Sequence, residues 1–175
     1  MKYTIKGFDS FDEGGCAEFY WIKEDKTIGF KQFGSKTSAT SAYNKQKKLS
    51  KFDLAPKVIG KVTKLNYEWG DETNWGYITE RAKVLNENVM KKRLRDIQDL
   101  VKNIEKKTKL RFWDCHYWNV GYIKRNNRAK LVCIDTGPES FNRDANAWGF
   151  DSPGPKCNSC MKYQCRCSSG YWCIP

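Results

Sequence analysis

The sequence predicts an α+β fold in which an N-terminal antiparallel sheet with one helix precedes a mainly helical region. Three observations predict it. Aromatic and β-branched residues form short runs from Thr4 to Phe33, the stretch from Thr37 to Leu49 loses this alternation, and apolar residues recur every three or four positions from Glu87 to about Lys109. The first pattern is typical of strands and the other two are typical of helices.

Turns and caps place the N-terminal elements. The turn-forming stretches DEGG and KEDKT divide residues 4–33 into a three-stranded meander. Ser35 or Thr37 can cap the helix that follows, and Pro56 forces an extended exit after it. Two further strands are expected at Val58–Leu65 and Gly76–Arg81, joined by the turn NYEWGDETN.

The C-terminal half begins with the best helix of the chain, in which Ile97, Val101 and Ile104 belong to one apolar stripe. Beyond it, GYIK and KLVCI are expected to form a hairpin around the polar turn RNNRA. The residues after Asp135 are rich in Gly, Pro, Cys and Asn and show little periodicity. A metal ion or the main core must therefore order this tail.

Composition favours a well-packed protein. The 175 residues are 39% hydrophobic and 14% aromatic, a content that argues against disorder. No stretch approaches the roughly 18 apolar residues of a membrane span, and the N-terminus lacks the apolar core of a signal peptide. We therefore expect no membrane association and a cytoplasmic location.

The net charge of +12 attracts polyanions such as nucleotide phosphates, nucleic acid or an acidic protein. Lys and Arg are concentrated in residues 36–64 and 91–111. Each run has two interpretations, a solvated face that keeps the protein in solution or a docking surface for an acidic protein partner.

Four residues occur in an order that suits phosphoryl transfer: Lys31 on a strand, then Asp114 and Asn119 after the long helix, then Asp135 after the hairpin. The reaction needs phosphates held by positive charge, a hard cation held by oxygen ligands, and a base near the attacking hydroxyl. A Lys, two carboxylates and an amide are the residue types that meet these needs.

The run LRFWDCHYWNVG resembles the catalytic loop of the protein-kinase-like superfamily, KLVCIDTG resembles its Asp-x-Gly metal motif, and IGFKQF resembles the strand with its nucleotide-binding Lys. The resemblance covers roughly residues 4–140 and implies a nucleotide-binding N-terminal lobe in residues 1–82 and a truncated helical C-terminal lobe with the catalytic loop and metal motif in residues 83–145. Composition sets apart a cysteine-rich tail in residues 146–175. It also implies that Asp114 is the catalytic base, that Asn119 and Asp135 bind Mg²⁺, and that Lys31 binds the phosphates of ATP.

The same resemblance suggests further nucleotide contacts. DEGGCAEFYWI is similar to a degenerate glycine-rich loop, in which Gly14 and Gly15 would let backbone approach the phosphates. YITERAKV stands where the family has its hinge between lobes, so Glu80 and Ala82 are candidates for backbone contacts to adenine. Compact chains of this kind resemble bacteriophage proteins, which would make the location the host cytoplasm.

The resemblance has departures that leave the activity open. The helix SKTSATSAYNKQKKL lacks the Glu that pairs with the nucleotide-binding Lys in active kinases, and the helices that usually complete the C-terminal lobe are not evident after Asp135. The expected function is an ATP- and Mg²⁺-dependent kinase acting on a hydroxyl, with Ser or Thr of a protein as acceptor. One alternative is a kinase-like nucleotide-binding or protein-interaction module without catalysis. A second alternative is a basic, zinc-containing nucleic-acid-binding protein.

The cysteine cluster of the tail predicts a structural Zn²⁺ site. Two close pairs of thiolates suit tetrahedral zinc, and free thiols or a redox pair are the other interpretations. The expected ligands are Cys157, Cys160, Cys165 and Cys167, with Cys173 as an alternative to one of the second pair. By contrast, Cys16, Cys115 and Cys133 lie among apolar residues and are expected to be buried as small hydrophobic side chains.

Overall fold

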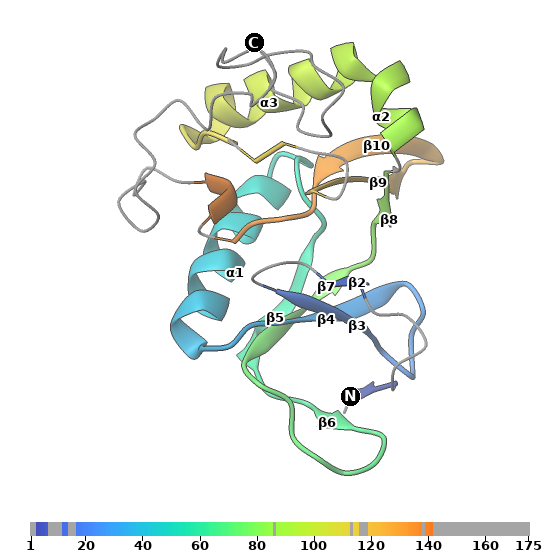
Figure 1. Cartoon of the computed structure of the whole chain (residues 1–175), viewed down its shortest axis with the longest axis vertical. Coiled ribbons are helices and arrows are strands. Elements are labelled where there is room, and N and C mark those ends of the chain that lie inside the picture. Colours follow the sequence, from blue (N-terminus) through green and yellow to red (C-terminus); the bar gives the residue numbers. More distant parts are fainter. Residues whose placement is uncertain are drawn as a thin grey trace. The chain divides into compact units, whose positions relative to one another are not determined.

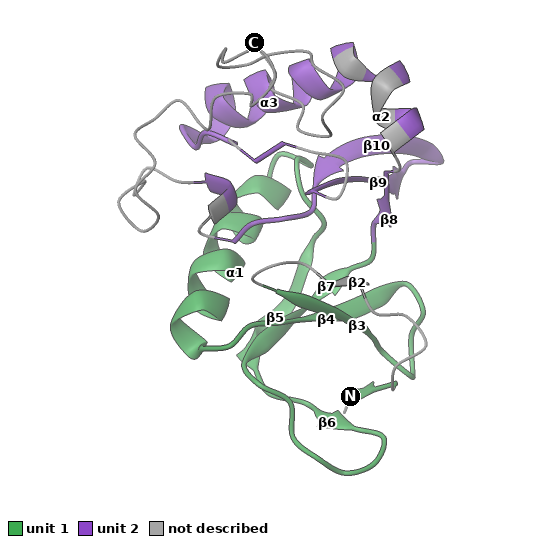
Figure 2. Ribbon diagram, in the orientation of Figure 1, with its two compact units in different colours: residues 1–81 green, residues 82–175 purple. Residues whose placement is uncertain are grey.

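The computed structural model describes residues 3–6, 12–13, 17–85, 87–112, 114–115, 119–137 and 139–141. These residues form helices and mainly antiparallel sheets, so the predicted α+β class is confirmed. The chain divides into two compact units, residues 1–81 and residues 82–175 (Figures 1 and 2). None of the helices among the described residues is long and apolar enough to cross a membrane.

Unit 1 is built on a five-stranded sheet in which every neighbouring pair is antiparallel. The first three strands of this sheet follow one another in the chain and lie next to each other, as in the expected meander, but the first of them, Asp12–Glu13, lies within the stretch DEGG that was expected to form a turn. The next two follow the helix, and the later of them is inserted beside the meander. The strands in spatial order are β2 (Asp12–Glu13), β3 (Glu18–Trp21), β4 (Ile28–Gln32), β7 (Gly76–Glu80) and β5 (Val58–Thr63).

Helix α1 (Lys36–Ser50) connects β4 to β5. Ser35 caps it, because its hydroxyl oxygen accepts a hydrogen bond from the Ser38 N–H at 3.1 Å, as the sequence predicts. The buried side of the helix carries Ala39 and Ala42, whose small side chains allow the helix to pack closely against the sheet. It packs on β5 and β7.

The two faces of the sheet have separate cores because side chains alternate along each strand. On one face Phe30 and Ile78 pack with Ile5 and Ile22. On the other face Phe33 and Tyr77 stack with ring centroids 5.8 Å apart and pack against α1. Both cores therefore depend on β4 and β7, the central strands.

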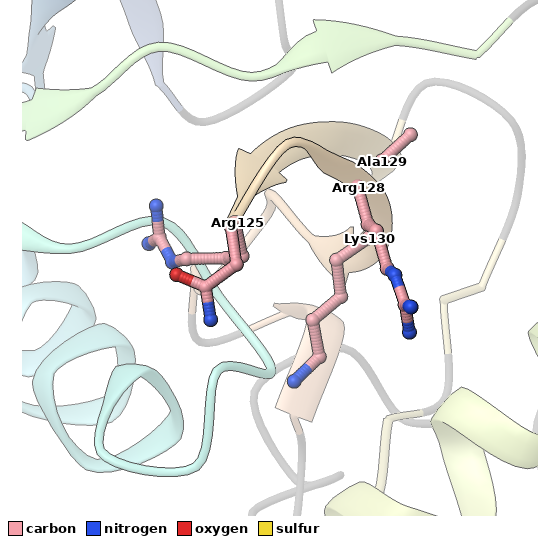
Figure 3. Close-up of a pocket in the computed structure, with 5 residues that line it drawn as sticks. Arg125, Arg128, Ala129 and Lys130 are labelled. Carbon is pink, nitrogen blue, oxygen red and sulfur yellow. The ribbon is translucent and has the colours of Figure 1, made fainter.

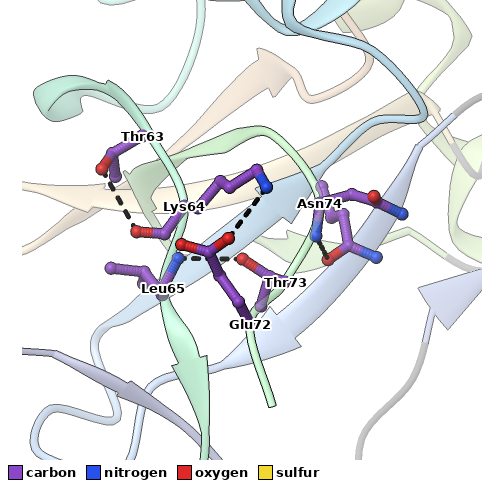
Figure 4. A network of polar contacts seen from close by, with 7 residues as sticks. Thr63, Lys64, Leu65, Glu72, Thr73 and Asn74 are labelled. Carbon is purple, nitrogen blue, oxygen red and sulfur yellow. Dashed lines mark hydrogen bonds and ion pairs between the residues drawn. The ribbon is translucent and has the colours of Figure 1, made fainter.

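A two-stranded parallel ladder joins β1 (Thr4–Ile5) to β6 (Asn66–Tyr67), a pairing that the sequence analysis did not anticipate. The loop that carries β6 is held by polar contacts shown in Figure 4. Lys64 Nζ lies 2.8 Å from Glu72 Oε2, and the Leu65 N–H donates to Thr73 Oγ1 at 2.9 Å. These contacts close the long connection between β5 and β7.

Unit 2 contains a three-stranded antiparallel sheet in the order β10-β9-β8, together with helices and a short 3-10 helix. One continuous helix from Glu87 to Lys109 was expected, and this expectation is wrong. The helix is divided at Arg93, although neither Pro nor Gly stands there. The elements are α2 (Glu87–Lys92), α3 (Leu94–Thr108), β8 (Lys83–Val84), β9 (Val120–Arg125), β10 (Arg128–Cys133) and η2 (Glu139–Phe141).

The expected apolar stripe does form the buried side of α3. Ile97 and Ile104 are fully buried, and α3 packs against β10. The hairpin of β9 and β10 also agrees with the sequence analysis. Its two-residue turn is Asn126–Asn127, both with positive φ (49° and 60°), which Asn tolerates better than most residues.

Candidate active site

The β9–β10 hairpin brings two of the predicted site residues to the same end of unit 2. The last ladder pair is Val120 with Cys133. One step further, the Ile134 N–H donates to the Asn119 carbonyl oxygen at 2.9 Å. Asn119 therefore immediately precedes β9, and Asp135 follows β10 one residue after this contact. Residues 16 positions apart in the sequence are neighbours because the turn reverses the chain.

Asp114 is joined to Asn119 by a direct contact. The side-chain amide of Asn119 donates from Nδ2 to the Asp114 carbonyl oxygen at 2.8 Å and to Asp114 Oδ2 at 3.0 Å. Asn119 is only 8% exposed, and buried amides need such partners. Since Nδ2 is occupied by Asp114, the orientation of the amide is fixed. Its carbonyl oxygen Oδ1 is the atom suited to bind a cation.

The Asp135 carboxylate is held from both sides. The Gly137 N–H donates to Oδ1 at 3.0 Å, and the Ser140 hydroxyl donates to Oδ2 at 2.6 Å. Ser140 is fully buried, and it lies on η2. Each carboxylate oxygen can accept more than one contact, so this bonding positions the group and still allows it to bind a cation.

Apolar packing supports the loop that carries Asp114. Phe112 and Phe141 stack with ring centroids 5.1 Å apart, and both are buried. Cys115 is buried beside Asp114, as the sequence predicts. Burial, with a smaller contribution from the Asp114 charge, raises the pKa of the Cys115 thiol far above its usual range. The thiol is therefore a neutral packing group.

Lys31 lies in unit 1, as the fourth of the five residues of β4, and is 8% exposed. Its register partner on β7 is Tyr77, so the lysine is on the face of the sheet that α1 covers. The ammonium group is 5.8 Å from the centroid of the Phe33 ring. Gly14 and Gly15, the expected phosphate-contacting glycines, lie outside the described residues.

Helix α1 has no acidic residue, and its buried polar residue is Gln46. The Tyr77 hydroxyl donates to Gln46 Oε1 at 2.8 Å, while Gln46 Nε2 donates to the Pro56 carbonyl oxygen and to Thr79 Oγ1. This amide links the helix to β7 and to the segment before β5. An amide thus occupies the buried polar position of this helix.

Glu18 is a carboxylate in the same sheet as Lys31, but it lies on the opposite face. Glu18 Oε2 accepts hydrogen bonds from the Tyr20 hydroxyl at 2.8 Å and from Gln32 Nε2 at 2.7 Å. Gln32 is the neighbour of Lys31 along β4, so its side chain projects on the opposite face. Glu18 therefore lies on the face of the sheet opposite Lys31.

The expected hinge residues lie at the boundary of the units. The Glu80 N–H donates to the Lys57 carbonyl oxygen at 2.8 Å, and the Arg81 N–H donates to the Thr27 carbonyl oxygen at 2.8 Å. These contacts tie the end of β7 into unit 1. Ala82 begins unit 2, directly before β8.

The predicted zinc ligands Cys157, Cys160, Cys165, Cys167 and Cys173 lie outside the described residues, as does Cys16. Within the described ranges, no group of three or more His, Cys, Asp or Glu residues is arranged to hold a metal ion. The predicted Mg²⁺ ligands are one carboxylate and one amide, a combination of hard oxygen donors that fits this cation.

Two residues of structural importance to these groups were not singled out from the sequence. Ser140 positions Asp135, and Gln46 organises the buried side of α1. A polar residue on the apolar side of a helix was the available signal for Gln46. For Ser140 the sequence offers only its position five residues after Asp135.

Comparison with models of known protein families found no match, and comparison with curated proteins found none either.

Proposed function

We propose that this chain is a protein-kinase-like, ATP- and Mg²⁺-dependent phosphotransferase that acts on a hydroxyl, with Ser or Thr of a protein as acceptor. The observation that carries the proposal is the gathering of Asp114, Asn119 and Asp135 at one end of the β9–β10 hairpin. Phosphoryl transfer requires oxygen ligands for a hard cation and a base near the acceptor. These three residues provide both.

The order of elements in unit 1 also supports the proposal. In protein kinases the nucleotide-binding Lys lies on the third strand, and the next helix follows it. Here β4 is the third strand of the five-stranded sheet along the chain, it carries Lys31, and α1 comes next. The burial of Lys31 strengthens its attraction to phosphate, because little water screens the charge.

Each residue has a distinct role in the proposed reaction. Asn119 and Asp135 would hold Mg²⁺, which would neutralise charge on the phosphates. The acceptor oxygen attacks the γ-phosphorus, the bond from that phosphorus to the β–γ bridging oxygen breaks, and ADP leaves. Asp114 takes the proton of the acceptor hydroxyl. Lys31 offsets the charge of the inner phosphates.

The second candidate function is a nucleotide-binding module that does not catalyse transfer. The observation that favours it is the absence of any acidic residue on α1, whose buried polar side chain is Gln46. In active kinases a Glu of the helix that follows positions the corresponding lysine, and α1 has no carboxylate that could do this. Such a module would bind ATP with Mg²⁺ but would transfer no phosphate.

Labelled ATP distinguishes these functions. Purified protein is incubated with Mg²⁺ and γ-labelled ATP, alone and with a Ser/Thr-containing protein mixture, and ATP binding is measured in parallel. Asp114→Asn should reduce transfer by about 10²- to 10⁴-fold and leave ATP binding intact, since a general base contributes about this much. Asp135→Asn should weaken both Mg²⁺-dependent binding and transfer.

Asp99→Asn, an exposed carboxylate on α3, is the matched control and should leave both quantities unchanged. Transfer that survives undiminished in both Asp114→Asn and Asp135→Asn would refute the assigned roles. Wild-type protein that binds ATP but incorporates no label would favour the non-catalytic module.

For the tail we propose a structural zinc, on the evidence of its cysteine spacing. Metal analysis of the purified chain should find about one zinc per molecule, and less in a Cys157→Ser, Cys160→Ser variant. Equal zinc content in the two proteins would contradict this assignment.

A further inference from the structure

Helix α1 and strand β5 pack against each other and together present a basic surface on unit 1 (Figure 1). Every charged residue of α1 is a lysine, and β5 contributes one more lysine. Exposed side chains on this surface, which we call the α1 ridge, are either lysines or neutral hydrogen-bond donors. They are Lys36, Thr40, Asn44, Lys47 and Lys48 of the helix and Lys61 of the strand.

The helix sets the spacing of the ridge. Its members from Lys36 to Lys47 recur every three or four residues, so they lie on one side of α1, opposite the side that packs on the sheet. These two lysines are roughly 16 Å apart along the axis, at about 1.5 Å per residue. Between them the Tyr43 hydroxyl donates to the Gly60 carbonyl oxygen at 2.8 Å, which places Lys61 of β5 beside the middle of the helix. The cations therefore lie in a row and not around one point.

Aromatic rings hold two of these lysines. Lys36 Nζ is 4.6 Å from the centroid of the Trp75 ring, and Lys47 Nζ is 5.5 Å from the centroid of the Tyr43 ring. Both rings pack against the core on the α1 side of the sheet. Cation–π contacts of this kind restrict the long side chains, so less conformational freedom is lost when an anion binds.

A row of lysines suits a polyanion whose charges are also arranged in a row. Duplex DNA carries one negative charge about every 1.7 Å along its axis, and its phosphates are contacted by Lys, Thr and Asn side chains, the residue types of the α1 ridge. The major groove of B-form DNA admits an α-helix, whereas that of duplex RNA is too narrow for side chains to read. We propose that the α1 ridge binds double-stranded DNA, with its lysines on the phosphates that border the major groove.

Two other partners fit these observations less well. Single-stranded nucleic acids bind by stacking their bases on aromatic rings, but the rings of Trp75 and Tyr43 already carry ammonium groups and pack into the core. Interfaces between proteins are anchored by aromatic residues and Arg, and Lys is depleted there. The charged residues of the ridge are lysines, which act as point charges toward phosphate.

The ridge lies in unit 1, and its residues are not those proposed to bind ATP or Mg²⁺. DNA binding therefore does not depend on the proposed function. The test measures the anisotropy of a fluorescein-labelled DNA duplex with the full chain, at several salt concentrations and without ATP or Mg²⁺. The variant Lys36→Gln, Lys47→Gln removes two charges from the ridge, and Lys36→Arg, Lys47→Arg keeps both charges.

The matched protein control removes two charges from another basic surface. At the turn end of the β9–β10 hairpin, Arg125, Arg128 and Lys130 are among the residues that line a pocket of about 480 Å³ (Figure 3). Lys124→Gln, Arg128→Gln removes two exposed cations from this hairpin and changes the net charge as much as the ridge variant does. Thermal unfolding of each variant checks that the fold is retained.

The salt dependence of binding gives the expected magnitude. The logarithm of the binding constant falls against the logarithm of the salt concentration with a slope of about −0.9 per phosphate contacted. Loss of two contacts in Lys36→Gln, Lys47→Gln should therefore make the slope shallower by about 1.8, which corresponds to roughly 60-fold weaker binding at about 0.1 M salt. The Arg variant and the hairpin variant should keep the wild-type slope.

Several results would overturn the proposal. Equal weakening by the ridge and hairpin variants would mean that net charge alone attracts DNA. Tighter, ridge-dependent binding of single-stranded DNA or duplex RNA would identify a different nucleic acid. Competition by polyglutamate as effective as that by unlabelled duplex would point to an acidic protein. Asp135→Asn should bind DNA like wild type, so a failure of kinase activity does not affect the result.

Discussion

Replacing Gly76 with Ala tests the packing at the centre of the five-stranded sheet. A Cβ at this position would lie 2.3 Å from the Lys31 carbonyl oxygen and 2.6 Å from Cζ of Phe30. Contacts this short do not occur, so β4 or β7 must move. The first obstacle is backbone, which cannot rotate away as a side chain can. Gly76 pairs with Gln32 in the ladder, so movement there disturbs the strand that carries Lys31.

The expected magnitude follows from two opposing effects. Overpacking of a well-packed region costs about 1–3 kcal/mol. Replacement of Gly by Ala gives back about 0.4–1 kcal/mol by restricting the unfolded chain. The net loss should be about 1–2 kcal/mol, which for a chain of this length lowers Tm by roughly 2–8 °C. ATP affinity should fall as well if Lys31 binds phosphate as proposed.

Gly34→Ala is the matched control, because a Cβ there would meet no atom within 4 Å. It should leave Tm unchanged or raise it slightly. Both proteins are measured by thermal unfolding followed by circular dichroism and calorimetry. Equal Tm values for Gly76→Ala and Gly34→Ala would refute the close approach of β4 and β7 described here.

Three further predictions concern single side chains. Gln46→Leu should lower the free energy of unfolding by about 1–3 kcal/mol in urea, because the buried Tyr77 hydroxyl loses its acceptor. The Cys115 thiol, whose pKa is raised by burial, should react with iodoacetamide at pH 8 more than ~10-fold slower in the folded protein than in urea, as followed by peptide mass spectrometry. The pKa of Asp25 is lowered by hydrogen bonds from the Thr27 hydroxyl and N–H, so this carboxylate stabilises the fold above its unfolded pKa of about 3.9. That stability is lost as the pH falls through the lower folded-state pKa, so the Tm deficit of Thr27→Val should be present at pH 7 and shrink below about pH 4.

Specific results would contradict each of these. For Gln46→Leu it is an unchanged urea midpoint. For Cys115 the contradicting result is an equal rate of iodoacetamide labelling with and without urea. The Cys115→Ser variant identifies the labelled peptide. For Thr27→Val it is a Tm deficit of the same size at pH 3 and pH 7, which would show that the ionised Asp25 carboxylate is not the stabilised form.

Local chemistry explains the elements that were predicted correctly. The Ser35 cap, the exit at Pro56 and the Asn126–Asn127 turn depend on residues within a few positions of each other, and all are found in the structure. The break at Arg93 was not predicted, since it lies within a run of good helix formers. The parallel pairing of β1 with β6 joins residues about 60 positions apart and has no local signal.

The candidate site shows the same division. The resemblance of LRFWDCHYWNVG to a kinase catalytic loop led to the prediction that Asp114 and Asn119 belong to one site, and the two side chains are hydrogen-bonded. The role of Gln46 depends on a partner 31 positions away, so it could not be inferred from neighbouring residues. Ser140 bonds Asp135 five positions away, but no motif in the sequence marked it.

The sequence by itself determined helix α1 and the β9–β10 hairpin, because propensity, capping and alternation act over short distances. Only the tertiary structure decided that Lys31 and Glu18 occupy opposite faces of one sheet, that Gln46 fills the buried polar position of α1, and that three cations surround one pocket at the hairpin turn. These features arise from register and packing between distant segments. The pairing of strands sets which side chains share a face. A shift of one residue in the register of a strand would move each of its side chains to the other face of the sheet.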